Sequence, residues 1–279
     1  MEPDPLGLPE DLELEIFETL AMAEPFRIPS LLLVAFRVKL WIEPLLYRTI
    51  AITADGLQRH SHWTPEVLIS AIRSKPVSFI QKFVRIENLN IIGIQKVALH
   101  LQLISILPLR RLAVSLGNLL GDSPIDFSHP LFSQLTHLEV SDQGGPSGSE
   151  DDMDVWAGLS KVPHLAHFGF ASTRFLPICA QILRTCRSLR VFLRCGGHSH
   201  GLETALRALK WDVRFVSMYQ LEYTKDCQMG AHASEDSWSR CEDFIAKRRS
   251  GEIDRELFFL LRFISNCTSS SPTFCRRRQ

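Results

Sequence analysis

Hydrophobic positions at the start of the chain repeat with the period of a helix. Pro9 suits a first helical turn, where its missing N–H costs nothing, and the glutamates that follow fall mostly off the apolar face. The run from Leu31 to Phe36 is apolar all round, which predicts a second helix buried on several sides. Pro44 ends that helix and opens a third, so residues 1–50 are expected to form a three-helix module. The apolar face of the first helix comprises Leu12, Ile16, Phe17 and Leu20.

After residue 80 the pattern changes to a recurring phrase whose first, fourth and sixth residues are apolar. Successive copies start 23, 26, 30, 24 and 24 residues apart, and only Arg194, the sixth residue of the fifth copy, departs from the pattern. Spacing of this kind is typical of a repeat architecture. The six phrases start at Ile86, Leu109, Leu135, Leu165, Leu189 and Val213.

Each phrase predicts a strand, and helical spacing of apolar residues predicts helices between phrases, at 97–107, 175–186 and 201–211. A strand and a helix of this size cannot bury their apolar sides alone, so the units must stack. We therefore expect an α/β fold with a curved parallel sheet whose strands follow sequence order, forming a solenoid. The alternative is an α/β domain without repeats.

Strand alternation decides which residues of the phrase face the core. Residues four and six are expected inside, so residues three and five should lie on the open face of the sheet. Arginine and aromatic side chains are enriched among interface anchors, and the third position holds such residues or histidine in four phrases. This row is predicted to bind a partner, unless it is a solvated face: Arg111, His137, His167 and Phe215.

The remaining segments complete the domain plan. Residues 51–80 are predicted to be a connecting helical segment and residues 81–225 the repeat domain. Within residues 226–262, the apolar face of Trp238, Cys241, Phe244 and Ile245 predicts a C-terminal capping helix over the last repeat, because a stacked array exposes its end. Residues 263–279 are polar and Ser-rich, which predicts a disordered tail.

Composition narrows the possible functions. The 31 basic and 31 acidic residues balance, which gives no electrostatic argument for a nucleic-acid partner. Seven cysteines without a Cys-x-x-Cys pair favour reduced thiols, in the cytoplasm or the nucleus. Charged residues interrupt the apolar runs, so no membrane span is expected.

Motifs for catalysis are missing from the sequence. It has no nucleophile elbow, phosphate loop or dinucleotide glycine pattern. Cys195, His198 and His200 are metal-ligand types, but no second pair at zinc spacing accompanies them. We expect no catalytic residue, no metal and no cofactor, with an enzyme of unrecognised type as a minor alternative.

The N-terminal pattern resembles the F-box. The resemblance covers residues 8–48 and departs from many F-boxes at Ala35-Phe36-Arg37, where Cys or Ser usually stands beside Arg. The segment from Val38 to Arg48 is similar to F-box-like proteins common in mushroom-forming fungi. The pattern positions are Leu8, Pro9, Leu12, Ile16, Phe17, Leu20, Leu31, Val34, Val38 and Trp41.

This resemblance implies docking to the Skp-type adaptor of a cullin–RING ubiquitin ligase. The repeats resemble leucine-rich repeats, although the usual Asn or Cys three residues after each phrase is missing, and they would hold an unknown protein target. The chain would then be a non-catalytic substrate-recognition subunit. The alternatives are an ordinary three-helix cap, or an interaction scaffold with a degenerate F-box and no ligase role. The adaptor-facing surface would be built or supported by Leu8, Pro9, Leu12, Ile16 and Leu20.

Overall fold

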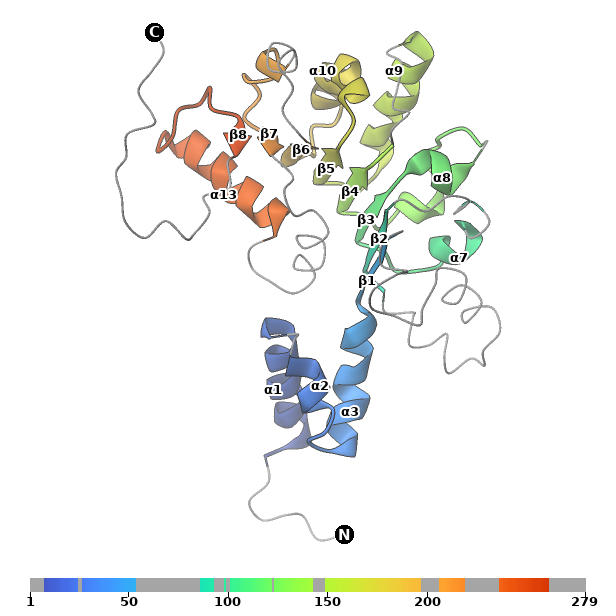
Figure 1. Ribbon diagram of the computed structural model, residues 1–279, viewed down its shortest axis with the longest axis vertical. Coiled ribbons are helices and arrows are strands. Elements are labelled where there is room, and N and C mark those ends of the chain that lie inside the picture. The colour runs from blue at the N-terminus through green and yellow to red at the C-terminus, as the bar shows by residue number, and fades with distance from the viewer. Residues whose placement is uncertain are drawn as a thin grey trace.

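Three short helices and a larger parallel sheet make up the protein, and strand β1 joins them (Figure 1). The helices lie at the N-terminal end, below the sheet in this view. The computed structural model describes residues 8–24, 27–53, 86–92, 98, 101–121, 123–142, 149–196, 206–218 and 236–260.

The N-terminal helices pack around a small core of their own, made of Ala21, Ile28, Leu31, Val38 and Ile42. The three predicted helices do not correspond one to one with these: the predicted second helix is divided into two, and the one expected after Pro44 is a 3-10 helix. The observed helices are α1 (Glu10–Ala23), α2 (Ile28–Leu31), α3 (Phe36–Ile42) and the 3-10 helix η2 (Glu43–Tyr47).

Two local predictions in this part were wrong. The apolar run does not continue as a buried helix, because α2 ends at Leu31 and the chain turns, leaving Leu33 and Val34 exposed. Pro9 lies one residue before the helix, as its N-cap, and its carbonyl oxygen accepts from the amides of Leu12 and Glu13. A proline with φ −52° and ψ 140° starts a helix well, since that extended geometry suits the residue before the first turn.

The sheet has eight strands in the order β1 to β8, and every neighbouring pair is parallel. The prediction that the six phrases form adjacent parallel strands in sequence order is confirmed, because they correspond to β2–β7. The strands are β1 (Thr49–Thr53), β2 (Asn88–Ile92), β3 (Arg111–Val114), β4 (His137–Val140), β5 (His167–Phe170), β6 (Val191–Cys195), β7 (Phe215–Met218) and β8 (Phe259–Leu260).

Strands β1 and β8 extend the sheet beyond the predicted phrases. Strand β1 includes residues 51–53, where a helical connection was expected. The rest of that connection, residues 54–80, lies outside the described residues, as does the predicted tail at 263–279.

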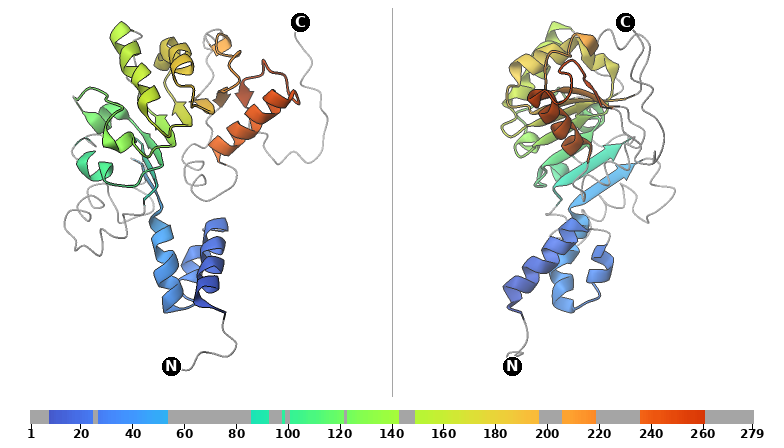
Figure 2. Two further views of the ribbon diagram at one scale, coloured as in Figure 1. Left: turned by 180° about the vertical axis from the view of Figure 1, so that it is seen from behind. Right: turned by 90° about the vertical axis from the view of Figure 1, so that its left-hand side faces the viewer.

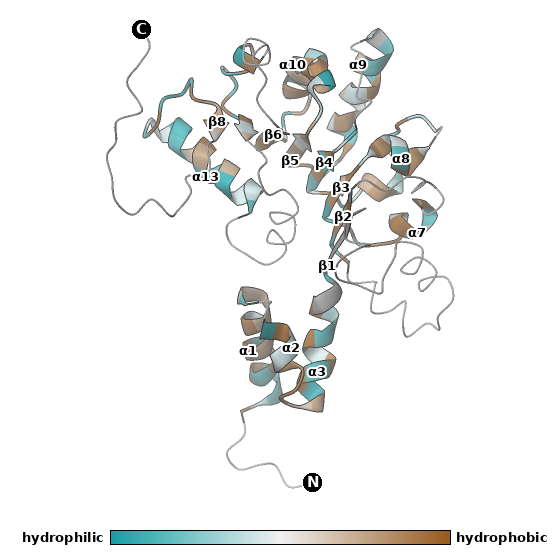
Figure 3. Ribbon diagram, viewed as in Figure 1, coloured by the Kyte–Doolittle hydropathy of each residue, from teal (hydrophilic) through white to brown (hydrophobic). Residues whose placement is uncertain are grey.

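Helices cover the outer side of the arc that the strands form (Figures 1 and 2). Figure 3 shows that hydrophobic residues gather in the strands and in these helices. The expected burial of residues four and six is confirmed in the first five phrases, for example at Leu112 and Val114. The helices are α7 (Leu101–Ser105), α8 (Leu116–Leu120), α9 (Glu150–Ala157) and α10 (Leu176–Thr185), with 3-10 helices η4 (Pro130–Phe132), η5 (Gly158–Lys161) and η6 (Thr173–Phe175).

The last phrase is shifted by one residue from its predicted register. Phe192, the fourth residue of the fifth phrase, pairs with Phe215 and not with Val216. Phe215 therefore points into the outer core, fully buried, with its ring centroid 6.1 Å from that of Phe192. The placement of Phe215 on the open face was wrong, because a one-residue slip moves every side chain of a strand to the opposite face.

The C-terminal helix α13 (Ser237–Ser250) covers the open face of the sheet instead of its end. Figure 1 shows it on the inner side of the arc, across the sheet from α7–α10. Val191 and Leu193 of β6, with Val216 and Met218 of β7, form a second buried cluster with α13. Strands that are apolar on both faces need cover on both, so the predicted end cap was wrong and β8 occupies that end.

Candidate interaction surfaces

The predicted adaptor-facing residues of the first helix expose an apolar row. Leu8, Leu12 and Ile16 are 56%, 46% and 51% exposed; Leu8 lies just before α1, and Leu12 and Ile16 lie one turn apart on it. Leu20 is half-buried against the small core of the three helices, and Pro9 caps the helix. Four of the five residues, Pro9 included, are therefore exposed to solvent, while Leu20 packs against the core of the three helices.

Further apolar residues that were not predicted to bind a partner are exposed near α1. Phe36 is 75% exposed and Leu40 57% exposed, one turn apart on α3, and Leu33 and Val34 precede them. The spacing of Phe36 and Leu40 was visible in the sequence, but the surrounding apolar run suggested burial. We call these residues and those of α1 the N-terminal apolar set: Leu8, Leu12, Ile16, Leu33, Val34, Phe36 and Leu40.

An ion pair fixes the two helices of this set to each other. The Arg37 guanidinium on α3 donates through Nε and Nη2 to the two carboxylate oxygens of Glu13 on α1, at 2.9 and 3.0 Å. A two-point contact of this kind restricts geometry more than a single bond does. The exposed apolar residues thus sit on a defined framework, as a partner-binding surface requires.

The second candidate surface is the row of third residues on the open face of the sheet. The register places Arg111 opposite His137 and His137 opposite His167, so these three residues are neighbours as predicted. Their expected exposure was wrong for His167, which is buried, while Arg111 and His137 are half-buried. Helix α13 causes this burial.

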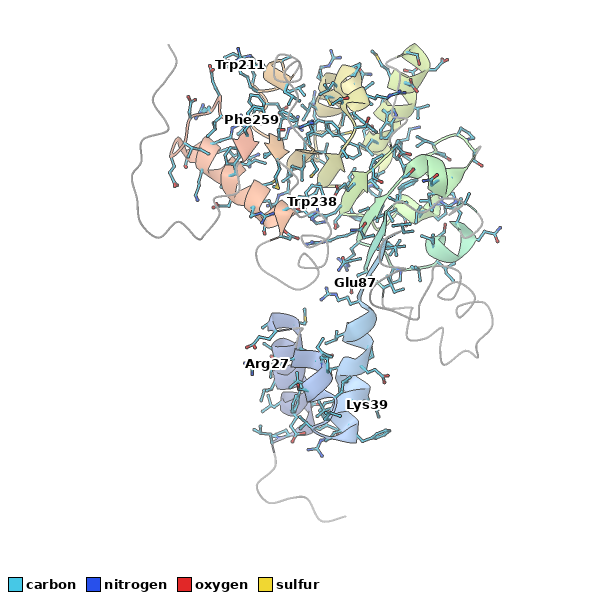
Figure 4. All side chains as sticks on the ribbon, viewed as in Figure 1. Arg27, Lys39, Glu87, Trp211, Trp238 and Phe259 are labelled. Carbon is cyan, nitrogen blue, oxygen red and sulfur yellow. The ribbon has the colours of Figure 1, made fainter. Side chains whose placement is uncertain are left out.

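Trp238, at the start of α13, closes over the two histidines. The imidazole rings of His137 and His167 stack with centroids 4.0 Å apart and planes at 4°. The indole of Trp238 meets both rings edge-on, at 5.4 and 5.6 Å between centroids. Figure 4 labels Trp238 at the end of α13 nearest strands β3 and β4. We call these three residues the histidine–tryptophan cluster.

Charged residues bracket this cluster on both sides. Arg111 Nη1 donates to Asp236 Oδ2, and Asp236 also caps α13 by accepting from the amide of Ser239 at 2.7 Å. On the other side, His167 Nε2 lies 3.0 Å from Glu242 Oε1, and Arg190 pairs with the same carboxylate at 3.2 Å. The first two turns of α13 are thus held to the sheet by polar contacts.

Burial makes the cluster hard to protonate. Desolvation, with smaller contributions from the charges of His167, Arg111 and Arg190, lowers the pKa of His137 to about 2. Desolvation also lowers the pKa of His167, although Glu242 acts in the opposite direction through its hydrogen bond and its charge. Both imidazoles are therefore neutral while α13 covers them.

Gly169 allows the indole to approach the sheet. A Cβ at this position would lie 2.9 Å from Cη2 of Trp238 and 3.2 Å from Cγ of Glu139. This role was not predicted, although a glycine inside a strand is the ordinary signal that something approaches the backbone closely.

The second half of α13 is anchored differently. Arg248 is fully buried, and its guanidinium donates to four backbone carbonyls, those of Lys210, Val213, Phe215 and Arg255, at 2.6 to 3.0 Å. These bonds tie the end of the helix to the turn before β7 and to the chain that follows α13. Phe244, Ile245 and Arg248 of this half are buried.

A further contact joins the N-terminal helices to the sheet. Arg48, between η2 and β1, donates through Nη2 to Glu87 Oε2 at 2.8 Å, and its carbonyl oxygen accepts from the amides of Glu87 and Asn88. Figure 4 labels Glu87 at this junction. The two parts of the protein are thus connected by both backbone and side-chain bonds.

Neither a metal centre nor a membrane span accompanies these surfaces in the described part of the chain. Within those residues no three His, Cys, Asp or Glu side chains gather as a metal site. The helices described are too short or too polar to cross a bilayer.

Comparison with family models, with curated proteins and with solved structures gave no match.

Proposed function

We propose that this protein is a non-catalytic substrate-recognition subunit of a Skp-cullin-F-box type ubiquitin ligase. The N-terminal helices would be an F-box-like module that docks the Skp-type adaptor. The sheet and its helices would be a degenerate leucine-rich-repeat domain that holds a protein target. The observation that carries the proposal is the N-terminal apolar set, together with the F-box-like spacing of α1.

The exposed apolar side chains of these helices favour the binding of a partner. Large apolar side chains exposed together on a small module are uncommon without a binding role. Leu8, Leu12 and Ile16 add little to the core of their own module, so their apolar character is unexplained by folding. A partner surface that buries them would gain about 1.5–3 kcal/mol for each side chain fully removed from water.

The predicted target-binding row does not have all four residues on the surface. Phe215 is a core residue, so we withdraw it as a target contact. Of the other three residues, Arg111 and His137 keep partial exposure while α13 is in place, and His167 does not. We propose that target recognition centres on Arg111 and His137, at the start of α13.

Calorimetric titration of the full chain with a fungal Skp-type adaptor tests the adaptor proposal. We expect wild-type binding, and we expect Leu12→Asp combined with Ile16→Asp to weaken it at least tenfold, because two buried apolar contacts would be replaced by charges. Both residues are exposed in the free protein, so the melting temperature should change little.

A matched control replaces another exposed apolar residue with the same charge. Ile106, which follows α7 in the sheet domain, is exposed, and Ile106→Asp should leave adaptor affinity unchanged. If the wild-type chain does not bind the adaptor, the alternative stands: an interaction scaffold with a degenerate F-box and no ligase role.

A further inference from the structure

Two halves of α13 are attached to the sheet in different ways. Phe244, Ile245 and Arg248 hold the second half through apolar packing and buried hydrogen bonds to backbone carbonyls. In the first half, Trp238 and the fully buried Cys241 belong to the same apolar cluster, and Trp238 also contacts the two histidines, beside the ion pairs of Asp236 and Glu242. The contacts of the first two turns therefore involve titratable histidines, whereas the contacts of Phe244, Ile245 and Arg248 do not.

The hydrogen bonds of the cluster fit neutral imidazoles. His167 Nε2 faces the Glu242 carboxylate and must carry the proton, which leaves Nδ1 bare. That Nδ1 is buried without a hydrogen-bond partner among the described residues. A second proton on His167 would be a buried donor with no acceptor, which is costly.

His137 is constrained in a similar way. The Thr136 hydroxyl donates to the Arg110 carbonyl, so it accepts from His137 Nδ1 at 2.8 Å. The proton of the neutral ring is thus on Nδ1, and a second proton would go to Nε2. It would charge a ring that stacks 4.0 Å from His167.

Charged groups from each neighbouring element bear on this titration. Arg111 from β3 and Arg190 before β6 disfavour a cation in the cluster, whereas Glu242 from α13 favours one on His167. Asp236, the N-cap residue of α13, forms an ion pair with Arg111. Glu139 from β4 lies beside Gly169 and Trp238. Because Glu242 partly compensates at His167, His137 is the more sensitive of the two.

We propose that the histidine–tryptophan cluster is an acid-sensitive latch: protonation of His137 and His167 releases the first two turns of α13 and uncovers the Arg111–His137–His167 row as a binding surface. The latch does not depend on the ligase function proposed above. The free surface would present an arginine and two imidazolium groups in one row, a pattern that fits an acidic peptide.

The direction of the pH effect follows from linkage. The pKa of His137 is depressed in the closed state and returns toward about 6.5 when Trp238 leaves, so closure is favoured above that pH and weakens as the pH falls below it. Between pH 7.5 and 5.5, His137 alone should raise the open-to-closed ratio about tenfold. Protonation of His167 should raise the open-to-closed ratio by a further, smaller factor.

Hydrogen–deuterium exchange of the full chain measures this ratio. Exchange rates of the amides in 239–243, divided by the intrinsic rates at each pH, should rise about tenfold from pH 7.5 to 5.5. Amides in 248–250, whose helical acceptors are the carbonyls of 244–246, should not change, because the second half of α13 stays anchored. Carboxymethylation of the fully buried Cys241, followed by mass spectrometry and corrected for thiolate fraction, should report the same opening.

Variants separate the latch from general acid sensitivity. His137→Gln and His137→Phe, the second keeping an aromatic ring in the stack, should each reduce the pH effect to about the His167 contribution. His164→Gln, at an exposed histidine, should retain the full effect. An unchanged ratio in the wild type, or an equal tenfold rise in a folded His137 variant, would overturn the proposal.

Discussion

Single residues decide how closely α13 approaches the sheet. Gly169 has no side chain where its strand neighbours on either side carry Glu139 and Leu193, and the indole of Trp238 fills that space. Periodicity placed Gly169 on the open face correctly, yet it could not name the ring above it. Tertiary partners are set by the whole chain, and a glycine in a strand signals only that something comes close.

Gly169→Ala tests this close approach. The added methyl would meet the rigid indole at 2.9 Å, and we expect a loss of about 1–3 kcal/mol in unfolding free energy from overpacking. Gly158→Ala is the matched control, since its Cβ would lie 3.5 Å from Cδ2 of Phe127, an ordinary contact. Urea denaturation of both variants measures the difference. Equal stability of the two would contradict the packing of Trp238 on β5.

At the scale of elements, the repeated phrase predicted strands β2–β6 in the right register. It predicted strand β7 too, but one residue out of register. The first phrases alternate between apolar core positions and polar or small open-face positions, so their phase is unambiguous. Phe215, Val216 and Met218 are apolar and buried on either face, which removes the alternation. The sequence predicted the amphipathic helix α13, but the face that it covers is set by Val191 and Leu193, which make the open face of β6 apolar as well.

Phe215→Ala distinguishes the observed register from the predicted one. In the outer core its ring packs between those of Phe192 and Phe258, so we expect a loss of about 3–5 kcal/mol in unfolding free energy. In the predicted arrangement, with Phe215 on an uncovered open face, the side chain would be exposed and the loss small. As a control, Trp211→Ala removes a ring that is 73% exposed and contacts Lys210, and it should cost less than about 1 kcal/mol. Equilibrium denaturation measures both losses, provided that the variants and the wild type show the same dependence of the unfolding free energy on denaturant concentration.

At the scale of the whole molecule, the two candidate surfaces lie on different parts of the protein (Figure 1). The N-terminal apolar set belongs to the three helices, and the row under α13 belongs to the sheet. A single residue, Arg48, separates η2 from β1, and its bonds to Glu87 and Asn88 hold the junction. Under the proposed function, an adaptor and a target would thus be bound at once, in a fixed mutual orientation.

The most direct test of the account is a hydrogen–deuterium exchange footprint of the full chain with a fungal Skp-type adaptor at pH 7.5. Binding should slow exchange in α1 and α3, within residues 10–23 and 36–42, because the adaptor would cover the N-terminal apolar set. Exchange in α13 should stay unchanged at this pH, since the latch is closed and lies away from the docking helices. Protection confined to the sheet or to α13, or no protection at saturating adaptor, would contradict the proposal that this protein is the substrate-recognition subunit of a ubiquitin ligase.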